Sequence, residues 1–319
     1  MTRQLAPHPS AKPKRPPGQD GKVPKRRWTA RTRRDFLVFL AMALPNLVLI
    51  AVFTYRPLFS NIYYSTLDWT LGSPTATVVG LANYATFFNS NDAPKVLGTT
   101  AVFTLVTVGG SMILGLLVAL ALNARVRGTT FARSAVFAPY VLSGVGVGLV
   151  WLFIFDPGYG VLAWLLRGIG QQSPQWINDP QLSLVMVILV YVWKNLGYCA
   201  VVYLAGLQSL PQEVMEAASL DGANGFRRFV SISLPLLSPT TFFLLITTML
   251  SSLQAFDLIR IMTPLGTGTS TLIYEAYLQA FGAYNRAGYS AAISVVLFAI
   301  LLVITVLQLR FVERKVHYS

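Results

Sequence analysis

The polar side chain that most needs a chemical explanation is Lys194, which follows Trp193 inside a long apolar run. A lysine at the centre of a bilayer costs about 2.5–3.5 kcal/mol on insertion scales, so its ammonium group should face a cavity, a partner or water. An anionic substrate would be such a partner, whereas internal pairing or snorkelling would satisfy the charge without any role in function. Asn195 and Tyr198 are close enough in sequence to line the same cavity. We therefore predict a substrate pathway beside this run.

A second polar set lies near the end of a later apolar run, where Ser251, Gln254, Asp257 and Arg260 are spaced by three residues. Steps of three keep side chains near one face of a helix. A polar stripe on a membrane helix is typical of a surface that lines the protein interior or a water-filled path. We predict that these four residues line the substrate pathway, with mutual neutralisation of Asp257 and Arg260 as the alternative.

No pattern in the sequence supports chemistry on a bound group. The phosphate-binding motif G-x-x-x-x-G-K-[ST] is missing, and no nucleophile–base pair or metal-ligand cluster stands out. The single cysteine, Cys199, lies in an apolar run and is expected to be a small core residue, while His8 and His317 lie at opposite ends of the sequence. We expect a protein that is not an enzyme and holds no cofactor or metal, with any ATP and Mg²⁺ bound by a separate chain.

The composition places the chain in a membrane. Of its 319 residues, 54% are hydrophobic and only 12% are charged, which lies outside the range of soluble domains. The net charge of +13 is concentrated, because residues 1–34 hold 11 of the 25 lysines and arginines. This segment is also rich in proline and poor in large apolar residues, so we expect a disordered cytoplasmic tail that contacts anionic lipid headgroups. Nucleic acid is not an expected partner.

Six apolar stretches are each long enough to cross a hydrocarbon core of about 30 Å as a helix. They lie at about 36–59, 96–124, 135–155, 184–207, 236–256 and 287–309. Pro45 predicts a kink in the first stretch, and Gly144, Gly146 and Gly148 predict tight packing or a flexible kink in the third. Basic residues after the second and sixth stretches place both termini in the cytoplasm. The predicted fold class is therefore an all-α integral membrane protein with six transmembrane helices.

A cytoplasmic connector at 209–235 joins the fourth and fifth stretches and contains the sequence EAASLDGANGFRRFVSISLP. Ser209 and Gln212 have capping-box spacing, which predicts the start of a helix, and Gly222 can supply a left-handed stop. Asn224 is a candidate N-cap for a second short helix, which the proline at the end of the connector should terminate. The apolar stripe of this hairpin is too small for a core and too hydrophobic for a solvated loop. We expect a docking element.

This connector resembles the EAA loop of permease subunits of bacterial ABC importers. The resemblance implies a type I importer (MetI-like) transmembrane domain over residues 35–319, whose hairpin seats in a cleft of a separate ATPase subunit. Glu216 would pair with a cation of that subunit, unless it is only a solvated helix acid, and Asp221 would contribute to docking or cap the second helix. The positions that match the coupling motif are Glu216, Ala217, Ala218, Asp221, Gly222, Ile232, Leu234 and Pro235.

The chain is similar to the MalF-like group of carbohydrate importer permeases. This similarity implies a bacterial cell membrane, a second related permease subunit, a dimer of ATPase subunits and an extracytoplasmic solute-binding protein. Within the group, the segments at 270–274 and 311–316 are similar to glycerol-3-phosphate permeases. We therefore expect uptake of sn-glycerol 3-phosphate or a glycerophosphodiester by alternating access, with a di- or oligosaccharide as the alternative substrate. A membrane scaffold or receptor that recruits partners through the basic tail is the alternative of another class.

Overall fold

The computed structural model describes residues 30–123 and 129–312. The predicted disordered tail therefore lies almost wholly outside the described residues. The chain divides into two parts, 1–56 and 57–319, which are taken separately.

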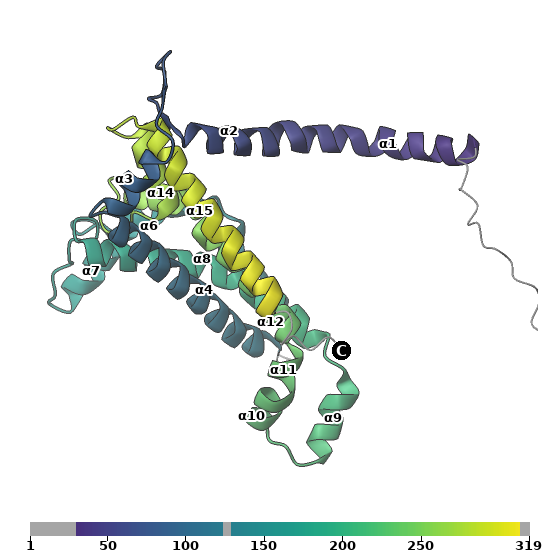
Figure 1. Cartoon of the computed structure of the whole chain (residues 1–319). Coiled ribbons are helices and arrows are strands. Elements are labelled where there is room, and N and C mark those ends of the chain that lie inside the picture. Colours follow the sequence, from purple (N-terminus) through teal and green to yellow (C-terminus); the bar gives the residue numbers. More distant parts are fainter. Residues whose placement is uncertain (1–29, 124–128, 313–319) are drawn as a thin grey trace, which may run out of the picture. The chain divides into compact units, whose positions relative to one another are not determined.

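The first part consists of helix α1 (Ala30–Ile50) and a π-helical turn, η1 (Ala51–Tyr55). α1 continues through Pro45 as one helix (Figure 1). Membrane helices tolerate such prolines because other groups can satisfy the freed carbonyl. The irregular turn comes later than predicted, at η1, where the Arg56 N–H donates to the Ala51 carbonyl.

The second part is helical apart from a two-stranded antiparallel hairpin, in which Leu67 pairs with Val78. Its first half contains α2 (Arg56–Tyr64), β1 (Leu67–Asp68), β2 (Thr77–Val78), α3 (Ala82–Asn89), α4 (Ala93–Asn123), α5 (Thr129–Val141), α6 (Gly144–Phe155), α7 (Val161–Gly168) and α8 (Pro180–Gln208). Its second half contains α9 (Gln212–Leu220), α10 (Gly225–Arg228), η2 (Phe229–Ser233), α11 (Leu234–Leu236), α12 (Ser238–Leu253), α13 (Asp257–Met262), α14 (Leu272–Phe281), α15 (Ala287–Leu307) and η3 (Gln308–Val312).

Five helical segments of the described chain are long and apolar enough to cross a membrane, and a bent pair supplies a sixth. The five are Arg34–Tyr64, Ala93–Asn123, Pro180–Gln208, Ser238–Met262 and Ala287–Arg310. The six predicted stretches are therefore all found. Segments between the predicted stretches also contain short helices, namely α3, α7, α13 and α14.

The third predicted span is broken. Thr130–Val141 and Gly144–Phe155 meet at 97° across Leu142 and Ser143. Two of the three glycines predicted to pack or bend, Gly144 and Gly148, lie close to a neighbouring helix, whereas Gly146 faces open space. A Cβ on Gly144 would lie 3.1 Å from the Asp257 Cβ, and a Cβ on Gly148 would lie 2.9 Å from the Ile261 side chain. The small residues thus let α6 pack closely on α13.

Helices α4 and α8 pack along each other. A Cβ on Gly115 would lie only 2.5 Å from the Cys199 Cβ, so this glycine permits the close approach. Gly110 approaches Val192 in the same way. Cys199 is fully buried, which confirms the prediction that it is a small core residue.

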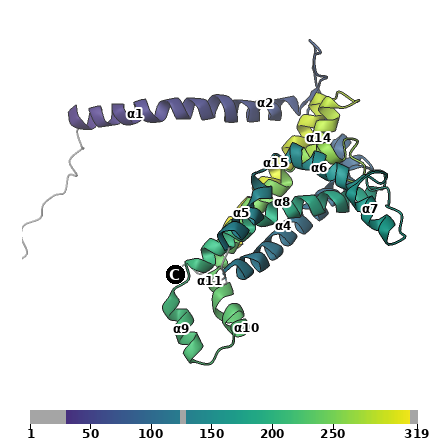
Figure 2. The ribbon, with the colours of Figure 1, turned by 180° about the vertical axis from the view of Figure 1, so that it is seen from behind.

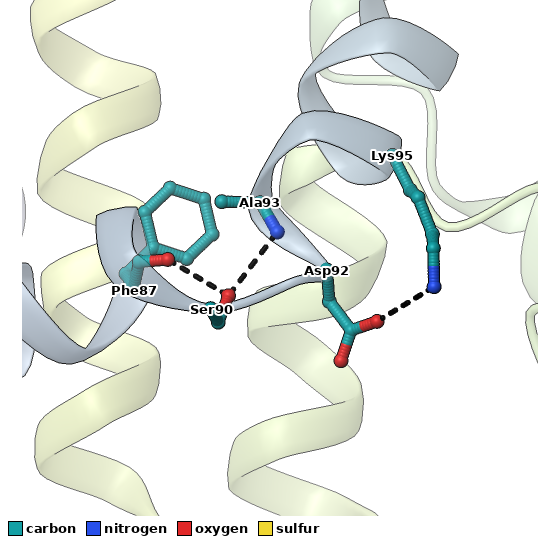
Figure 3. A network of polar contacts seen from close by, with 5 residues as sticks. All are labelled: Phe87, Ser90, Asp92, Ala93 and Lys95. Atoms are coloured by element: carbon teal, nitrogen blue, oxygen red, sulfur yellow. Dashed lines mark hydrogen bonds and ion pairs between the residues drawn. The ribbon is translucent and has the colours of Figure 1, made fainter.

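Figures 1 and 2 show α9 and α10 at one end of the long helices of the second part, with α3, α7 and α14 at the opposite end. At that opposite end, Ser90 fixes the turn between α3 and α4 (Figure 3). Its hydroxyl donates to the Phe87 carbonyl at 2.8 Å and accepts from the Ala93 N–H at 3.1 Å. Lys95 and Asp92 form an exposed ion pair of 3.2 Å on the next turn.

Candidate substrate cavity and coupling hairpin

The break between α5 and α6 determines the surroundings of Lys194. The last carbonyls of a helix have no partner within that helix, and α5 ends at Val141. The Lys194 ammonium, on α8, donates to the Tyr140 carbonyl at 2.8 Å and lies 5.3 Å from the centre of the Tyr140 ring. A positive charge at a helix C-terminus is favourable because it opposes the helix dipole. Lys194 therefore pairs internally with backbone and ring.

The approach of α5 to α8 makes this contact possible. A Cβ on Gly197 would collide with the Val136 carbonyl oxygen, so only glycine fits there. Lys194 lies one helical turn before Gly197 on α8. Its ammonium group therefore reaches the carbonyl of Tyr140, one turn after Val136 on α5. Figure 2 shows α5 lying beside α8.

A cavity of about 250 Å³ opens beside Lys194, between α8, the start of α6 and the α12–α13 junction. It is lined by Gly144, Tyr191, Lys194, Asn195, Gln254, Ala255, Phe256, Asp257 and Leu258. Four of the seven residues predicted for the substrate pathway, Lys194, Asn195, Gln254 and Asp257, thus lie together. Among the described residues, neither Lys194 nor Asp257 has an oppositely charged atom within 4.0 Å. We call this site the charged cavity, because it is lined by a lysine and an aspartate that no ion pair joins.

A second cavity of about 10 Å³ adjoins the first, because Tyr191 and Asn195 line both. Its other lining residues are Thr107, Val108, Ser111, Tyr140, Tyr198, Thr248 and Ser251. Two more of the predicted residues, Tyr198 and Ser251, lie here. The Tyr198 ring stacks on Tyr140 with 4.9 Å between centroids, and its hydroxyl lies 3.3 Å from the Thr247 hydroxyl. We call this site the hydroxyl chamber.

Arg260 departs from the predicted stripe. α12 ends at Leu253 and α13 begins at Asp257, so the four polar residues do not share one continuous helix. Arg260 lies over the Tyr277 ring at 4.7 Å and the Phe256 ring at 5.9 Å, and it lines neither of the two cavities. The alternative of an Asp257–Arg260 ion pair is also not observed within the described residues.

Several lining residues were missed by sequence reasoning, and Tyr140, Tyr191 and Ser111 are the most informative. Tyr140 and Tyr191 read as ordinary interfacial or core aromatics, and Ser111 is a single small residue within a long apolar run. A serine in the middle of a membrane helix was the available signal. The sequence could not show that the Ser111 side chain faces the hydroxyl chamber, because this depends on how α4 packs on α8 and α12.

The connector forms two short antiparallel pieces, α9 and α10 (Figure 1). Gly222 adopts φ +75° at the turn, as predicted. Asn224 caps α10 by accepting from the Arg227 N–H at 2.8 Å, which confirms the predicted N-cap. Asp221 is exposed at the C-terminal end of α9, and Asn224 supplies the cap that was considered for it.

Two local predictions for this connector are wrong. The Ser209 hydroxyl donates to the Gly206 carbonyl at 2.8 Å at the end of α8, and α9 begins without a side-chain cap. Pro235 does not terminate the second helix either. The π-helical turn η2 precedes it, and the Leu237 N–H then donates to the Ser233 carbonyl, so the chain runs helically into α12. Proline needs no N–H partner near the start of a helical piece, which explains why it is tolerated.

The EAA residues lie on both faces of the hairpin. Ala218 is buried and Ile232 is half-buried, while Ala217, Leu234 and Pro235 are exposed. The exposed Glu216 carboxylate accepts from the Gln212 amide at 2.6 Å. Glu216 also lines a cleft of about 660 Å³, together with Arg228 of α10 and the ends of α4 and α8.

The tip of the hairpin carries two large apolar side chains that sequence reasoning did not single out. Leu220 is 89% exposed and Phe226 is 78% exposed. They flank the turn around Gly222. Exposed apolar side chains grouped on a rigid turn are typical of an interaction site.

Comparisons with known proteins agree with this architecture. Residues 111–318 match the family described as binding-protein-dependent transport system inner membrane component. The chain is 37% identical over 286 residues to the sn-glycerol-3-phosphate transport system permease protein UgpA of Agrobacterium fabrum, covering 89% of this chain and 97% of that protein. It is 34% identical over 281 residues to the UgpA of Yersinia pestis, covering 87% and 95%.

The fold is also similar to that of a solved bacterial alginate ABC transporter in complex with an alginate-bound periplasmic protein. The TM-score is 0.80 at 22% identity, over 91% of this chain and 98% of that chain. The family match and the relatives together show that the chain belongs to the binding-protein-dependent transport system inner membrane components, the membrane permease subunits of ABC importers.

Proposed function

We propose that this permease subunit takes up sn-glycerol 3-phosphate or a glycerophosphodiester by alternating access. The observation that carries the proposal is the charged cavity, where Lys194 faces a space between membrane helices and forms no ion pair within 4.0 Å among the described residues, although Asp257 lines the same cavity. A phosphate needs such a cation where water is scarce. The names of the relatives support the same substrate class.

In this proposal the chain is not an enzyme, and it binds neither ATP nor Mg²⁺. A dimer of ABC ATPase subunits hydrolyses ATP, and its closure moves the hairpin of α9 and α10. α10 continues through η2 and α11 into α12, so movement of the hairpin would be transmitted to the helices beside the charged cavity. A second related permease completes the pathway, because Ser251, Gln254 and Asp257 are exposed in the single chain. An extracytoplasmic solute-binding protein delivers the substrate.

The proposed location is the bacterial inner (cytoplasmic) membrane, with both termini in the cytoplasm. The hairpin and the outer helices α3, α7 and α14 lie at opposite ends of the second part, as this orientation requires. Basic residues at both ends of the sequence support the same orientation.

Uptake by the reconstituted complex tests the substrate. Proteoliposomes that contain both permeases and the ATPase, supplied with the binding protein, are given labelled sn-glycerol 3-phosphate in competition with a glycerophosphodiester and a disaccharide. We expect ATP-dependent uptake that the phosphodiester reduces and the disaccharide does not. Uptake of the disaccharide alone would favour the sugar-permease alternative.

Removing the apolar tip should weaken docking to the ATPase. Phe226→Ala and Leu220→Ala are each expected to raise the Kd for the ATPase by roughly tenfold or more, since large apolar anchors at an interface centre contribute about 2 kcal/mol or more. The Kd is measured by titrating labelled ATPase onto the purified permease pair. Phe281→Ala is the matched control, because Phe281 is 67% exposed at the end of α14. An unchanged Kd for both tip variants would exclude the tip from the interface.

A further inference from the structure

Ser111 is a buried hydroxyl group whose role the proposed transport function does not explain. It lies in the middle of α4 with 1% of its surface exposed. Its Oγ has no hydrogen-bond partner among the described residues. Buried hydroxyls are normally satisfied, because an unpaired one loses its bonds to water without replacement. An unpaired group of this kind suggests a ligand.

Ser111 lines the hydroxyl chamber, and several neighbouring hydroxyls there are already engaged. Thr107 donates to the Phe103 carbonyl and lies 2.7 Å from the Ser252 hydroxyl, and Thr248 donates to the Leu244 carbonyl at 2.6 Å. Both threonines line the chamber. Ser111 is left with hydrogen-bonding capacity inside it.

The chamber has the size of one small polar group. Its volume of about 10 Å³ corresponds to roughly one water-sized sphere, so it accommodates a single hydroxyl and excludes a sugar ring. It adjoins the charged cavity through Asn195, whose amide N–H donates to the Tyr191 carbonyl at 2.8 Å. The amide oxygen of Asn195 therefore remains as an acceptor on a residue that lines both sites.

We propose that Ser111 is a specificity-determining residue, whose hydroxyl binds a hydroxyl of a polyol phosphate while the phosphate lies beside Lys194 in the charged cavity. This inference rests on the proposed function, and it adds a second recognition point and an orientation for the substrate. A substrate without the hydroxyl leaves Ser111 unpaired, and sites that bind a hydroxyl discriminate strongly against analogues that lack it.

The test uses the complete complex in proteoliposomes with the binding protein saturated, so that maximal uptake rates report on the permease. The substrates are sn-glycerol 3-phosphate and its two analogues that each lack one hydroxyl, 3-hydroxypropyl phosphate and 2-hydroxypropyl phosphate. We expect the wild type to transport at least one analogue roughly tenfold more slowly than the parent compound. Ser111→Ala should slow the parent to the rate of that analogue and leave the analogue unchanged.

Thr104→Val is the matched control. Thr104 also lies on α4, is 3% exposed and has an unpaired hydroxyl among the described residues, but it lines a separate apolar cavity. This variant should keep the wild-type discrimination. If Ser111→Ala slows all three substrates equally, or retains full discrimination, Ser111 only bonds a structural water or stabilises the fold, and the inference is wrong. If the wild type transports none of the phosphates, the proposed substrate itself is wrong.

Discussion

Lys194→Met is expected to lower the maximal uptake rate for sn-glycerol 3-phosphate by roughly ten- to hundredfold. Methionine has similar length and no charge, so the phosphate loses its charge-assisted contact, which is worth about 1.5–3 kcal/mol. The Tyr140 carbonyl also loses its partner, so a small reduction in thermal stability should accompany the effect. Labelled uptake in proteoliposomes measures the rate, and the yield of complex on size-exclusion chromatography measures assembly.

Lys95→Met provides the control for loss of a lysine. Lys95 is exposed at the start of α4 and pairs with Asp92 (Figure 3). Exposed ion pairs contribute about 0–1 kcal/mol, so neither uptake nor assembly should change. Normal uptake by a normally assembled Lys194→Met complex would remove Lys194 from the substrate pathway and leave it as a cap on α5.

Glu216→Gln is expected to uncouple ATP hydrolysis from transport. The substitution retains an acceptor for the Gln212 amide, so the local bond of 2.6 Å can persist and only the charge is removed. Truncating one member of a charge pair buried at an interface costs about 2–5 kcal/mol. We expect the Kd for the ATPase to rise at least about thirtyfold, and stimulation of ATPase activity by the loaded binding protein to be lost.

Glu213→Gln is the matched control on the same helix. Glu213 is exposed in the first turn of α9 and does not line the cleft that contains Glu216. Removal of its charge should leave the Kd for the ATPase unchanged.

Deleting residues 1–34 distinguishes the transporter from the alternative of a membrane scaffold or receptor. The scaffold or receptor would require the basic tail and would not require Glu216. Loss of function on that deletion, together with a silent Glu216→Gln, would contradict the transporter proposal.

The sequence by itself determined the membrane class, the positions of the six apolar stretches and the local geometry of the hairpin turn. Hydropathy is a property of individual residues, so a continuous apolar stretch such as that of α4 or α15 is recognised without knowing its neighbours. Gly222 and Asn224 were also predictable, because a left-handed turn and an N-cap involve only residues a few positions apart. The motif in the same stretch identified the kind of transporter.

Only the tertiary structure decided which polar groups meet. Lys194 finds its partner in Tyr140, 54 positions earlier in the chain, because Gly197 lets α8 approach the backbone of α5 and because α5 ends just beyond Tyr140. The break in the third span also depends on packing, since glycines at 144 and 148 are compatible with a bend or with close packing of a straight helix. The gap between α12 and α13 is likewise a feature of the folded chain. Bonding between distant segments depends on how helices pack, and packing depends on all the contacting side chains together, which no local pattern records.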